Sequence, residues 1–296
     1  MSLHQPNTKL LAFASDTQAP MLVETILLRS MQNRKATRLL LQHIIDIHPH
    51  TFFLLGDVVN LGYSQKQWRP IDRHLHQLRA KGIKLHGILG NHEVMGQPKK
   101  GEQEFQYRFP DHVRTGYSVM VDSIAVVLLN SNFGTMSIPE IMKQTRWYRK
   151  TLQELDADTS IEFIITCAHH SPFTNSRIVK PSKEVQRLIV PSFLESRKSQ
   201  LFLSGHCHAF EHFKVKGKDF MVIGGGGGLR QPLRKGIGTL ADLAEDYKPM
   251  FHYITVNIID DYLQVRSFHL KKDFSGFEEG MKLDIKKFTE VVKKSD

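Results

Sequence analysis

The sequence predicts an α/β fold, and two observations lead to this prediction. Apolar runs of strand length alternate with longer stretches of helical spacing, and several of the apolar runs end in Asp, Asn or His. In a layered α/β fold the strand ends along one edge of a sheet converge, so these polar residues are candidates for a shared site. The chain has 296 residues, 41% of them hydrophobic, which is ample for a sizeable core. We expect a single domain over residues 1–296.

The beginning of the chain predicts a βαβ unit. Residues 9–16 and 51–57 are apolar runs that each end in Asp, which indicates buried strands. Between them, residues 35–47 have helical spacing and stop before Pro49. Two strands joined through a helix place both Asp residues at the same end of a sheet.

The same alternation continues to residue 204 and then gives way to strands. The elements expected up to that point are a helix at about 65–80, strands at 83–89, 115–121 and 124–130, a helix at 139–155, a strand at 161–168, a helix at about 183–197 and a strand at 200–204. A second sheet is expected to begin near residue 115. Beyond residue 204, a hairpin at 213–223 and two paired strands at 251–259 and 262–270 make the C-terminal part β-rich.

Five strand ends deliver side chains that bind metals. The residues concerned are Asp16 with Gln18, Asp57, Asn91 with His92, His170, and His206 with His208. Carboxylates, imidazoles and amide oxygens together suit first-row metals such as Mn, Fe or Zn better than an all-oxygen calcium site or an all-thiolate site. The sequence therefore predicts a metal site at the edge where these strands end.

The order of these elements resembles the calcineurin-like metallophosphoesterase superfamily, nearest to its purple acid phosphatase-like branch. Members carry Asp-x-His, Gly-Asp, Gly-Asn-His-Glu or Gly-Asn-His-Asp, His-x-Pro and Gly-His-x-His, each after a strand. The matching segments here are residues 16–18, 56–57, 90–93, 170–172 and 205–208. The resemblance covers a motif-bearing core of about 9–225, followed by the β-rich part at about 226–296. It implies a four-layer αββα sandwich with two mixed β-sheets flanked by helices.

The resemblance also implies a role for each matching residue. Two divalent or trivalent metal ions would be bridged by Asp57, with Asp16, Gln18 and His208 on the first ion and Asn91, His170 and His206 on the second. A hydroxide held between the ions would attack phosphorus, because bound cations lower the pKa of water. His92 would be the catalytic residue that contacts the phosphoryl oxygen or protonates the leaving group. The His-x-Pro spacing selects His170 as the ligand over its neighbour His169.

Three positions leave alternatives open. Gln18 stands where most members have His, and its neutral amide is a weaker donor, so the first metal is expected to bind loosely. Asn60 stands where purple acid phosphatases have a metal-binding Tyr; it is a possible extra ligand, and no purple colour is expected. Glu93 either orients the His92 ring or is a surface carboxylate. The five consecutive glycines at 224–228 form either a flexible connector or a rim of the active site.

These features predict a phosphoesterase that hydrolyses phosphate mono- or diesters of a small molecule. The formal net charge of +10 favours anionic partners and keeps a nuclease as one alternative. A catalytically weak metal-binding scaffold is another, because of Gln18. No apolar run reaches the roughly 20 residues that a transmembrane helix needs, and the N-terminus lacks a secretory signal, so we expect a cytoplasmic protein, with a removed leader or anchor as the alternative. The sequence does not specify the oligomeric state.

Overall fold

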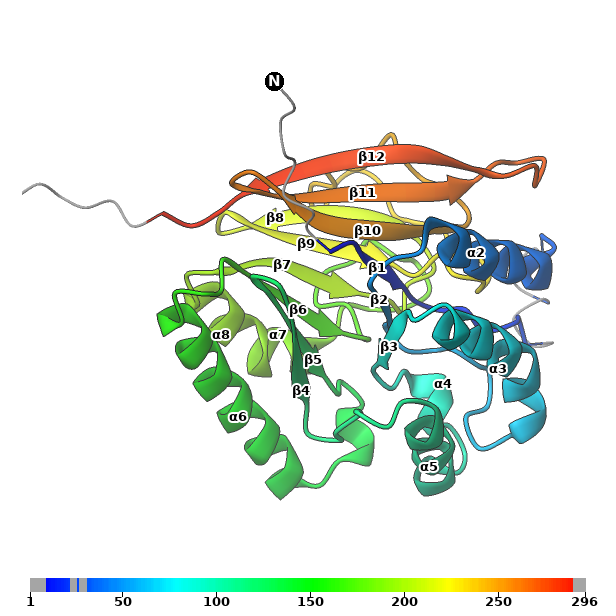
Figure 1. The fold of residues 1–296 in the computed structure, drawn as a ribbon, viewed down its shortest axis with the longest axis horizontal. Helices are drawn as coiled ribbons and strands as arrows, with labels where there is room; N and C mark the ends of the chain where they lie inside the picture. The colour runs from blue at the N-terminus through cyan, green and yellow to red at the C-terminus, as the bar shows by residue number, and fades with distance from the viewer. Residues whose placement is uncertain (1–8, 22–25, 27–30, 290–296) are drawn as a thin grey trace, which may run out of the picture.

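Two six-stranded sheets pack face to face, with helices on both outer faces (Figure 1). This arrangement comes from a computed structural model, which describes residues 9–21, 26 and 31–289. Both sheets contain parallel and antiparallel neighbours. The predicted α/β class and the predicted four-layer sandwich with two mixed sheets are therefore confirmed.

The first sheet joins both ends of the chain. Its strands, in the order in which they pair, are β12 (Phe277–Lys286), β11 (Tyr262–Leu270), β10 (His252–Ile259), β1 (Leu11–Ala14), β2 (Thr51–Leu54) and β3 (Lys84–Gly87). β1, β2 and β3 run parallel, as the βαβ pattern predicts. β10 pairs antiparallel with β1, with Phe13 opposite Ile254, so the β-rich C-terminal part completes this sheet.

The second sheet comes from the middle of the chain. Its paired order is β4 (Tyr117–Val121), β5 (Ile124–Leu129), β6 (Phe163–Ala168), β7 (Ser199–Ser204), β9 (Lys218–Ile223) and β8 (Phe210–Val215). β5, β6, β7 and β9 are parallel, while β4 and β8 are antiparallel edge strands. The second sheet thus begins at Tyr117, close to the residue at which the sequence predicts it.

The helices cover the two outer faces separately. α2 (Asn33–Ile47), α3 (Gln65–Ala80), α4 (Asn91–Val94) and α5 (Pro98–Arg108) follow the strands of the first sheet, and their apolar residues pack on its outer face. α6 (Ile138–Ala157), α7 (Lys183–Leu188) and α8 (Val190–Glu195) pack on the second sheet, and a 3₁₀ turn at Phe133–Thr135 precedes α6. Across residues 9–21, 26 and 31–289, no helix is long and apolar enough to span a membrane.

The core between the sheets is built from residues that alternate along the strands. Phe13 and Phe53 lie on neighbouring strands, and their rings stack with centroids 4.7 Å apart. Both are fully buried and belong to one apolar cluster with Val126, Phe163 and Leu203 of the second sheet. Because side chains alternate between faces, the remaining apolar strand residues face the helices instead. The near-continuous apolar runs in the sequence follow from burial on both faces.

Several expected elements differ in detail. The helix predicted at 183–197 is two short helices that meet at Ile189, because Pro191 lacks an N–H and its ring would clash with the preceding turn. The hairpin begins at Phe210 instead of residue 213. α5 and β12 were not predicted. β12 is an exposed edge strand whose side chains are mostly polar, with lysines that discourage edge pairing, so its sequence has no apolar run.

We predict that Phe53→Ala lowers the free energy of unfolding by about 3–5 kcal/mol, because it removes a fully buried ring from the core between the sheets. Urea denaturation measures this change. Phe288→Ala serves as the matched control, because Phe288 is 41% exposed and its loss should alter stability by only about 0.5 kcal/mol. A cost at Phe53 no larger than at Phe288 would contradict the described core.

Candidate metal centre

The strand ends named from the sequence meet at one edge of the sandwich. Asp16 follows β1, Asp57 follows β2 and Asn91 begins α4 just after β3. From the second sheet, His169 directly follows β6 and His206 lies two residues after β7. Parallel strands end on the same side of a sheet, which explains why residues far apart in sequence are neighbours here. The edge therefore carries two buried carboxylates among several imidazoles.

Backbone strain aims three of these side chains into the site. Asp16, Asp57 and His206 all have positive φ angles, of 60°, 50° and 65°. A residue with a side chain adopts this conformation at a cost of about 1 kcal/mol or more, and only where surrounding contacts hold it there. The contacts are present: the Asp16 carboxylate accepts the His206 N–H at 3.0 Å, and the Asp57 N–H donates to Glu93 at 2.8 Å. Strain concentrated in this way is typical of functional sites.

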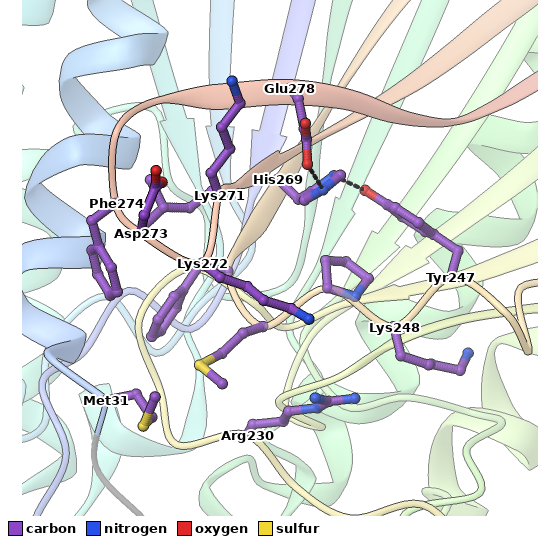
Figure 2. A pocket seen from close by; sticks show the side chains of 14 residues that line it. Met31, Arg230, Tyr247, Lys248, His269, Lys271, Lys272, Asp273, Phe274 and Glu278 are labelled. Atoms are coloured by element: carbon purple, nitrogen blue, oxygen red, sulfur yellow. Dashed lines mark hydrogen bonds and ion pairs between the residues drawn. The ribbon is translucent and has the colours of Figure 1, made fainter.

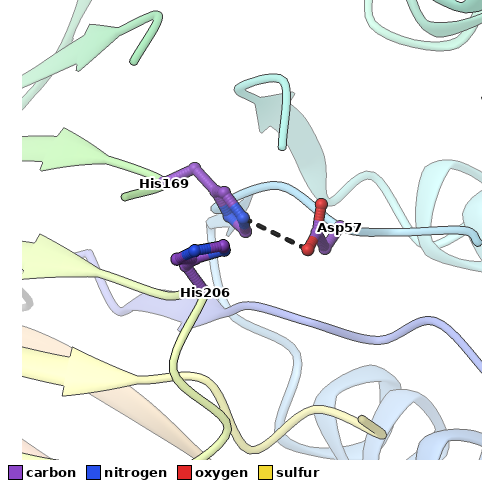
Figure 3. A group of neighbouring side chains, drawn as sticks. All are labelled: Asp57, His169 and His206. Carbon is purple, nitrogen blue, oxygen red and sulfur yellow. Dashed lines mark ion pairs between the residues drawn. The ribbon is translucent and has the colours of Figure 1, made fainter. Parts of the chain in front are cut away.

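Asp57, His169 and His206 form one cluster, in which the three side chains point toward one another (Figure 3). One potential ligand atom from each lies within 4.8 Å of the other two. The Nε2 atom of His169 is 3.2 Å from the Asp57 carboxylate and 3.2 Å from the Oδ1 atom of Asn91. Asn91 thus joins this cluster, which offers one carboxylate, one amide oxygen and two imidazoles.

Burial and charge act in opposite directions on these groups. Burial alone would raise the pKa of Asp57, but the imidazoles around it, His169 first, hold that pKa well below its usual range. Burial works to lower the pKa of His169, but the Asp57 carboxylate outweighs it and raises the pKa to about 9. Burial and the neighbouring imidazoles of His170 and His169 lower the pKa of His206 to about 3. The cluster therefore keeps its carboxylate ionised and favours positive charge beside it.

Asp16 and Gln18, which follow β1, form a second cluster with His208, which follows β7 of the second sheet. The Nε2 atom of His208 lies 3.3 Å from the Asp16 carboxylate and 3.2 Å from the Gln18 amide group. The amide satisfies both of its atoms when its nitrogen donates to the backbone oxygens of Asp16 and Asp57, at 3.1 and 2.6 Å. In that orientation the Gln18 oxygen faces His208, so it is available as a ligand.

In both clusters one histidine contacts a backbone carbonyl through Nδ1 and a carboxylate through Nε2. His169 Nδ1 donates to the backbone oxygen of Leu55, and His208 Nδ1 donates to that of Leu229, each at 2.9 Å. A carbonyl oxygen only accepts, so Nδ1 carries the hydrogen and Nε2 is turned toward a carboxylate. In each cluster the lone pair on the histidine Nε2 would repel the facing carboxylate unless a proton or a metal cation lies between the two atoms. Orientation of imidazole by a backbone carbonyl is the usual support of a metal-binding His, so these residues fit metal ions.

Asn60 supplies a further oxygen that fits a cation. It lies three residues after Asp57 and is 7% exposed. Its Oδ1 atom is buried, and within the described parts of the chain no donor reaches it. Buried acceptors are nearly always satisfied, by protein, water or an ion. The role of Asn60 as an extra ligand stays a prediction.

The structure distinguishes the two adjacent histidines that the sequence left in competition. His170 lies close by, with its ring centroid 4.5 Å from that of His206, but its Nδ1 contacts the Ser131 hydroxyl at 2.8 Å. The His-x-Pro spacing selects His170 as the ligand, but His169 is the ring that lies next to Asp57 and Asn91. His170 as a ligand stays a prediction, and the geometry favours His169. The signal in the sequence was that His169 directly follows a buried strand.

His92 and Glu93 have separate supports, which corrects the expected pairing between them. The His92 ring is fixed by its Nδ1, which donates to the backbone oxygen of Asn60 at 3.0 Å, and its Nε2 lies 3.8 Å from the Asp57 carboxylate. Glu93 is fully buried and accepts the N–H groups of Asp57, Val58, Val59 and Gly90. It is not a surface carboxylate, and it orients the Asp57 loop instead of the His92 ring.

The glycine run at 224–228 is a close-packed wall of the site. All five glycines are buried. A Cβ added at Gly228 would lie 2.4 Å from the His208 ring, and one at Gly224 would lie 3.0 Å from the Asp16 carboxylate. The Gly226 and Gly228 N–H groups donate to the backbone oxygens of Ser15 and Asp16. Of the two alternatives, the rim of the site agrees with these contacts and a loose connector does not.

A sequence model of the family described as calcineurin-like phosphoesterase matches residues 10–210. The chain belongs to the calcineurin-like phosphoesterase family. The resemblance stated from the motifs is therefore confirmed, and the described residues include a group able to hold a metal ion.

Several solved structures share the fold at low identity. The purple acid phosphatase isolated from yellow lupin (Lupinus luteus) seeds matches with 15% identity and a TM-score of 0.67, over 95% of this chain and 54% of that one. A dimetal phosphatase from Danio rerio matches with 13% identity and a TM-score of 0.60, over 95% and 99%. The anchor in the inner membrane complex of Plasmodium matches with 11% identity and a TM-score of 0.66, over 96% and 90%. This chain thus spans about half the length of the lupin protein.

We predict that Glu93→Ala lowers the free energy of unfolding by at least about 3 kcal/mol, because it leaves several buried backbone N–H groups without an acceptor. Chemical denaturation measures the change. Glu154→Ala is the control; its side chain is 63% exposed, so a change of only about 0.5 kcal/mol is expected. Equal effects of the two substitutions would show that Glu93 does not hold the Asp57 loop.

Proposed function

We propose that this phosphoesterase hydrolyses phosphate mono- or diesters of small molecules with the help of two metal ions. The observation that carries the proposal is the pair of carbonyl–imidazole–carboxylate arrangements at Asp57 and Asp16, on neighbouring strand ends. When bound, the ions would supply a hydroxide nucleophile shared between them and would offset negative charge on the phosphoryl oxygens. Mn, Fe and Zn suit this donor set.

The proposed ligands follow the two clusters. Asp57 would be shared, Asn91, His169 and His206 would hold one ion, and Asp16, Gln18 and His208 would hold the other. His169 replaces His170 in this assignment because its Nε2 lies 3.2 Å from the Asp57 carboxylate. Gln18 gives the second set a neutral donor in place of an imidazole, so that ion is expected to bind more weakly.

His92 would act on the substrate itself. Because its Nδ1 donates to Asn60, its Nε2 is free to hold or give a proton at the edge of the Asp57 cluster. A protonated Nε2 would donate to a phosphoryl oxygen or to the leaving alkoxide. If it donates to the leaving alkoxide, His92 itself is the general acid of the reaction. The ring is 7% exposed and fixed by its backbone contact, so it is positioned before the substrate binds.

The adjacent cleft supports a small substrate. A cavity of about 470 Å³ is lined by Asn91 and His170 on the metal side and by Phe133, Ser182 and Glu184 elsewhere. This volume lies within the range of small-molecule sites. Among the described residues that line it, none is Lys or Arg, whereas a nucleic acid needs a basic path for its phosphates. The volume of the cleft suits a small phosphate ester, whereas the neighbouring cavity that shares Gly134 and Thr135 with it carries Lys99, Lys100 and Arg114, so the nuclease alternative stays open.

We predict that His92→Ala lowers kcat about a hundredfold or more and leaves the metal content unchanged, because it removes a proton donor and no ligand. Hydrolysis of para-nitrophenyl phosphate and its bis ester, measured with elemental analysis, tests this. His76→Ala, at an exposed histidine of α3, is the matched control and should keep full activity.

Asp57→Ala should abolish turnover and remove both metal ions in the same assays, because it takes away the shared carboxylate. The control is Asp246→Ala, at an exposed carboxylate. Metal without turnover of either ester in the unchanged protein would support the scaffold alternative. Turnover of single-stranded DNA in preference to both esters would support a nuclease. A protein that takes up no Mn, Fe or Zn contradicts the proposal.

The two adjacent histidines allow a direct test of the ligand assignment. We predict that His169→Ala loses about one metal ion per chain, whereas His170→Ala keeps both ions, since only His169 lies against Asp57 and Asn91. Elemental analysis after gel filtration gives the two contents. The reverse result would return the ligand role to His170.

A further inference from the structure

A second cavity, of about 690 Å³, is lined by residues that precede β10 and by the turn between β11 and β12 (Figure 2). It is bounded by Met31 before α2, by Arg230, by residues 247–251 before β10, and by the turn between β11 and β12. None of the proposed metal ligands lines it. Arg230 lies two residues after Gly228, which packs against His208, so the chain connects this cavity to the metal centre although the two share no residue.

The walls of this cavity are mainly apolar. The apolar residues that line it are Met31, Pro249, Met250, Phe251, Leu270 and Phe274. Phe251 and Leu270 are buried, so their part of the wall is fixed by packing. The side chains of Met31 and Met250 are flexible and can adapt to the shape of a ligand. Sites for small organic molecules combine such walls with a few polar groups, at volumes of this order.

Five polar groups of the lining are already paired with protein: Tyr247, Lys248, His269, Asp273 and Glu278. Tyr247 contacts His269 Nδ1 at 3.0 Å, and His269 Nε2 contacts Glu278 at 2.8 Å. The Asp273 carboxylate accepts the N–H and hydroxyl of Ser275 in its own turn. Lys248 donates to the Phe210 oxygen and to Asp242. These groups require nothing from a ligand.

Three cations of the lining, Arg230, Lys271 and Lys272, lack such partners, and the side chain of Lys271 points away from the other two (Figure 2). Arg230 and Lys272 are exposed, and they form no hydrogen bond or ion pair with any residue in the described ranges. Figure 2 shows both side chains reaching into the cavity from different loops. An apolar wall with two unpaired cations is complementary to a molecule that has an apolar body and a negative head.

We propose that this cavity binds an amphipathic organic anion, with its acyl or aryl body against Met250 and Phe251 and its anionic head between Arg230 and Lys272. Binding is independent of the metal centre, because no proposed ligand takes part. The site is therefore separate from the place where a phosphate ester would be hydrolysed.

Isothermal titration calorimetry on the full chain, at neutral pH, tests the proposal with three probes. Octanoate carries both an apolar tail and a charge, octanol has the tail alone, and acetate has the charge alone. We expect octanoate to bind saturably at one site, about tenfold or more tighter than either of the others. Saturation must occur below the concentration at which octanoate forms micelles.

Four variants locate the binding. Arg230→Ala and Lys272→Ala should each weaken octanoate binding about tenfold, since each removes a charge-assisted contact. Lys150→Ala, at a side chain that is 77% exposed on α6, is the matched control and should have no effect. Asp57→Asn should also bind octanoate normally, which separates this site from the metal centre.

Four results would overturn the proposal. The first is the absence of saturable octanoate binding, and the second is octanol binding as tight as octanoate. The third is octanoate binding that is unaffected by Arg230→Ala and Lys272→Ala, and the fourth is binding lost in Asp57→Asn, because in either case octanoate would occupy another site. None of these results depends on whether the protein hydrolyses phosphate esters.

Discussion

Two buried carboxylates, Asp16 and Asp57, impose the constraint on which the site depends. They follow neighbouring parallel strands and are 0% and 1% exposed, so their charge must be compensated inside the protein. The compensation comes from imidazoles of the second sheet, which face the carboxylates through their Nε2 atoms. The two sheets therefore meet at an electrostatic contact as well as an apolar core. A pair of cations in that contact would satisfy the imidazoles and the carboxylates together.

Backbone geometry holds this arrangement in place at some cost. Asp57 has a positive φ angle, and the Glu93 carboxylate binds the N–H groups of the loop that contains it. Burial and the Asp57 charge together raise the pKa of Glu93 to about 7, although its backbone donors act the other way. The glycine run lets the chain pass close to His208. The loops at the strand ends are thus as closely specified as the strands, as expected where ligands must be positioned before binding.

The sequence predicts the fold better than the contacts within the site. Alternating strands and helices and five strand ends are visible without a structure, because they depend on local periodicity and on residue type. The choice between His169 and His170 is not visible, since it depends on which ring turns toward Asp57 at the end of β6. The role of Glu93 depends on a loop 36 residues away in sequence. The edge strand β12 has no apolar run, but Met281, Leu283 and Ile285 alternate with polar residues, which is a signal of a half-buried strand that the sequence analysis did not use.

The central claim is that two metal ions lie between the sheets and share Asp57. The most direct measurement is the anomalous scattering of crystals of the unchanged protein grown with Mn²⁺. We predict two anomalous peaks, one next to Asp57, Asn91, His169 and His206 and the other next to Asp16, Gln18 and His208, with Asp57 contacting both. An anomalous map without peaks at this edge, or with its peaks away from Asp57, would contradict the account.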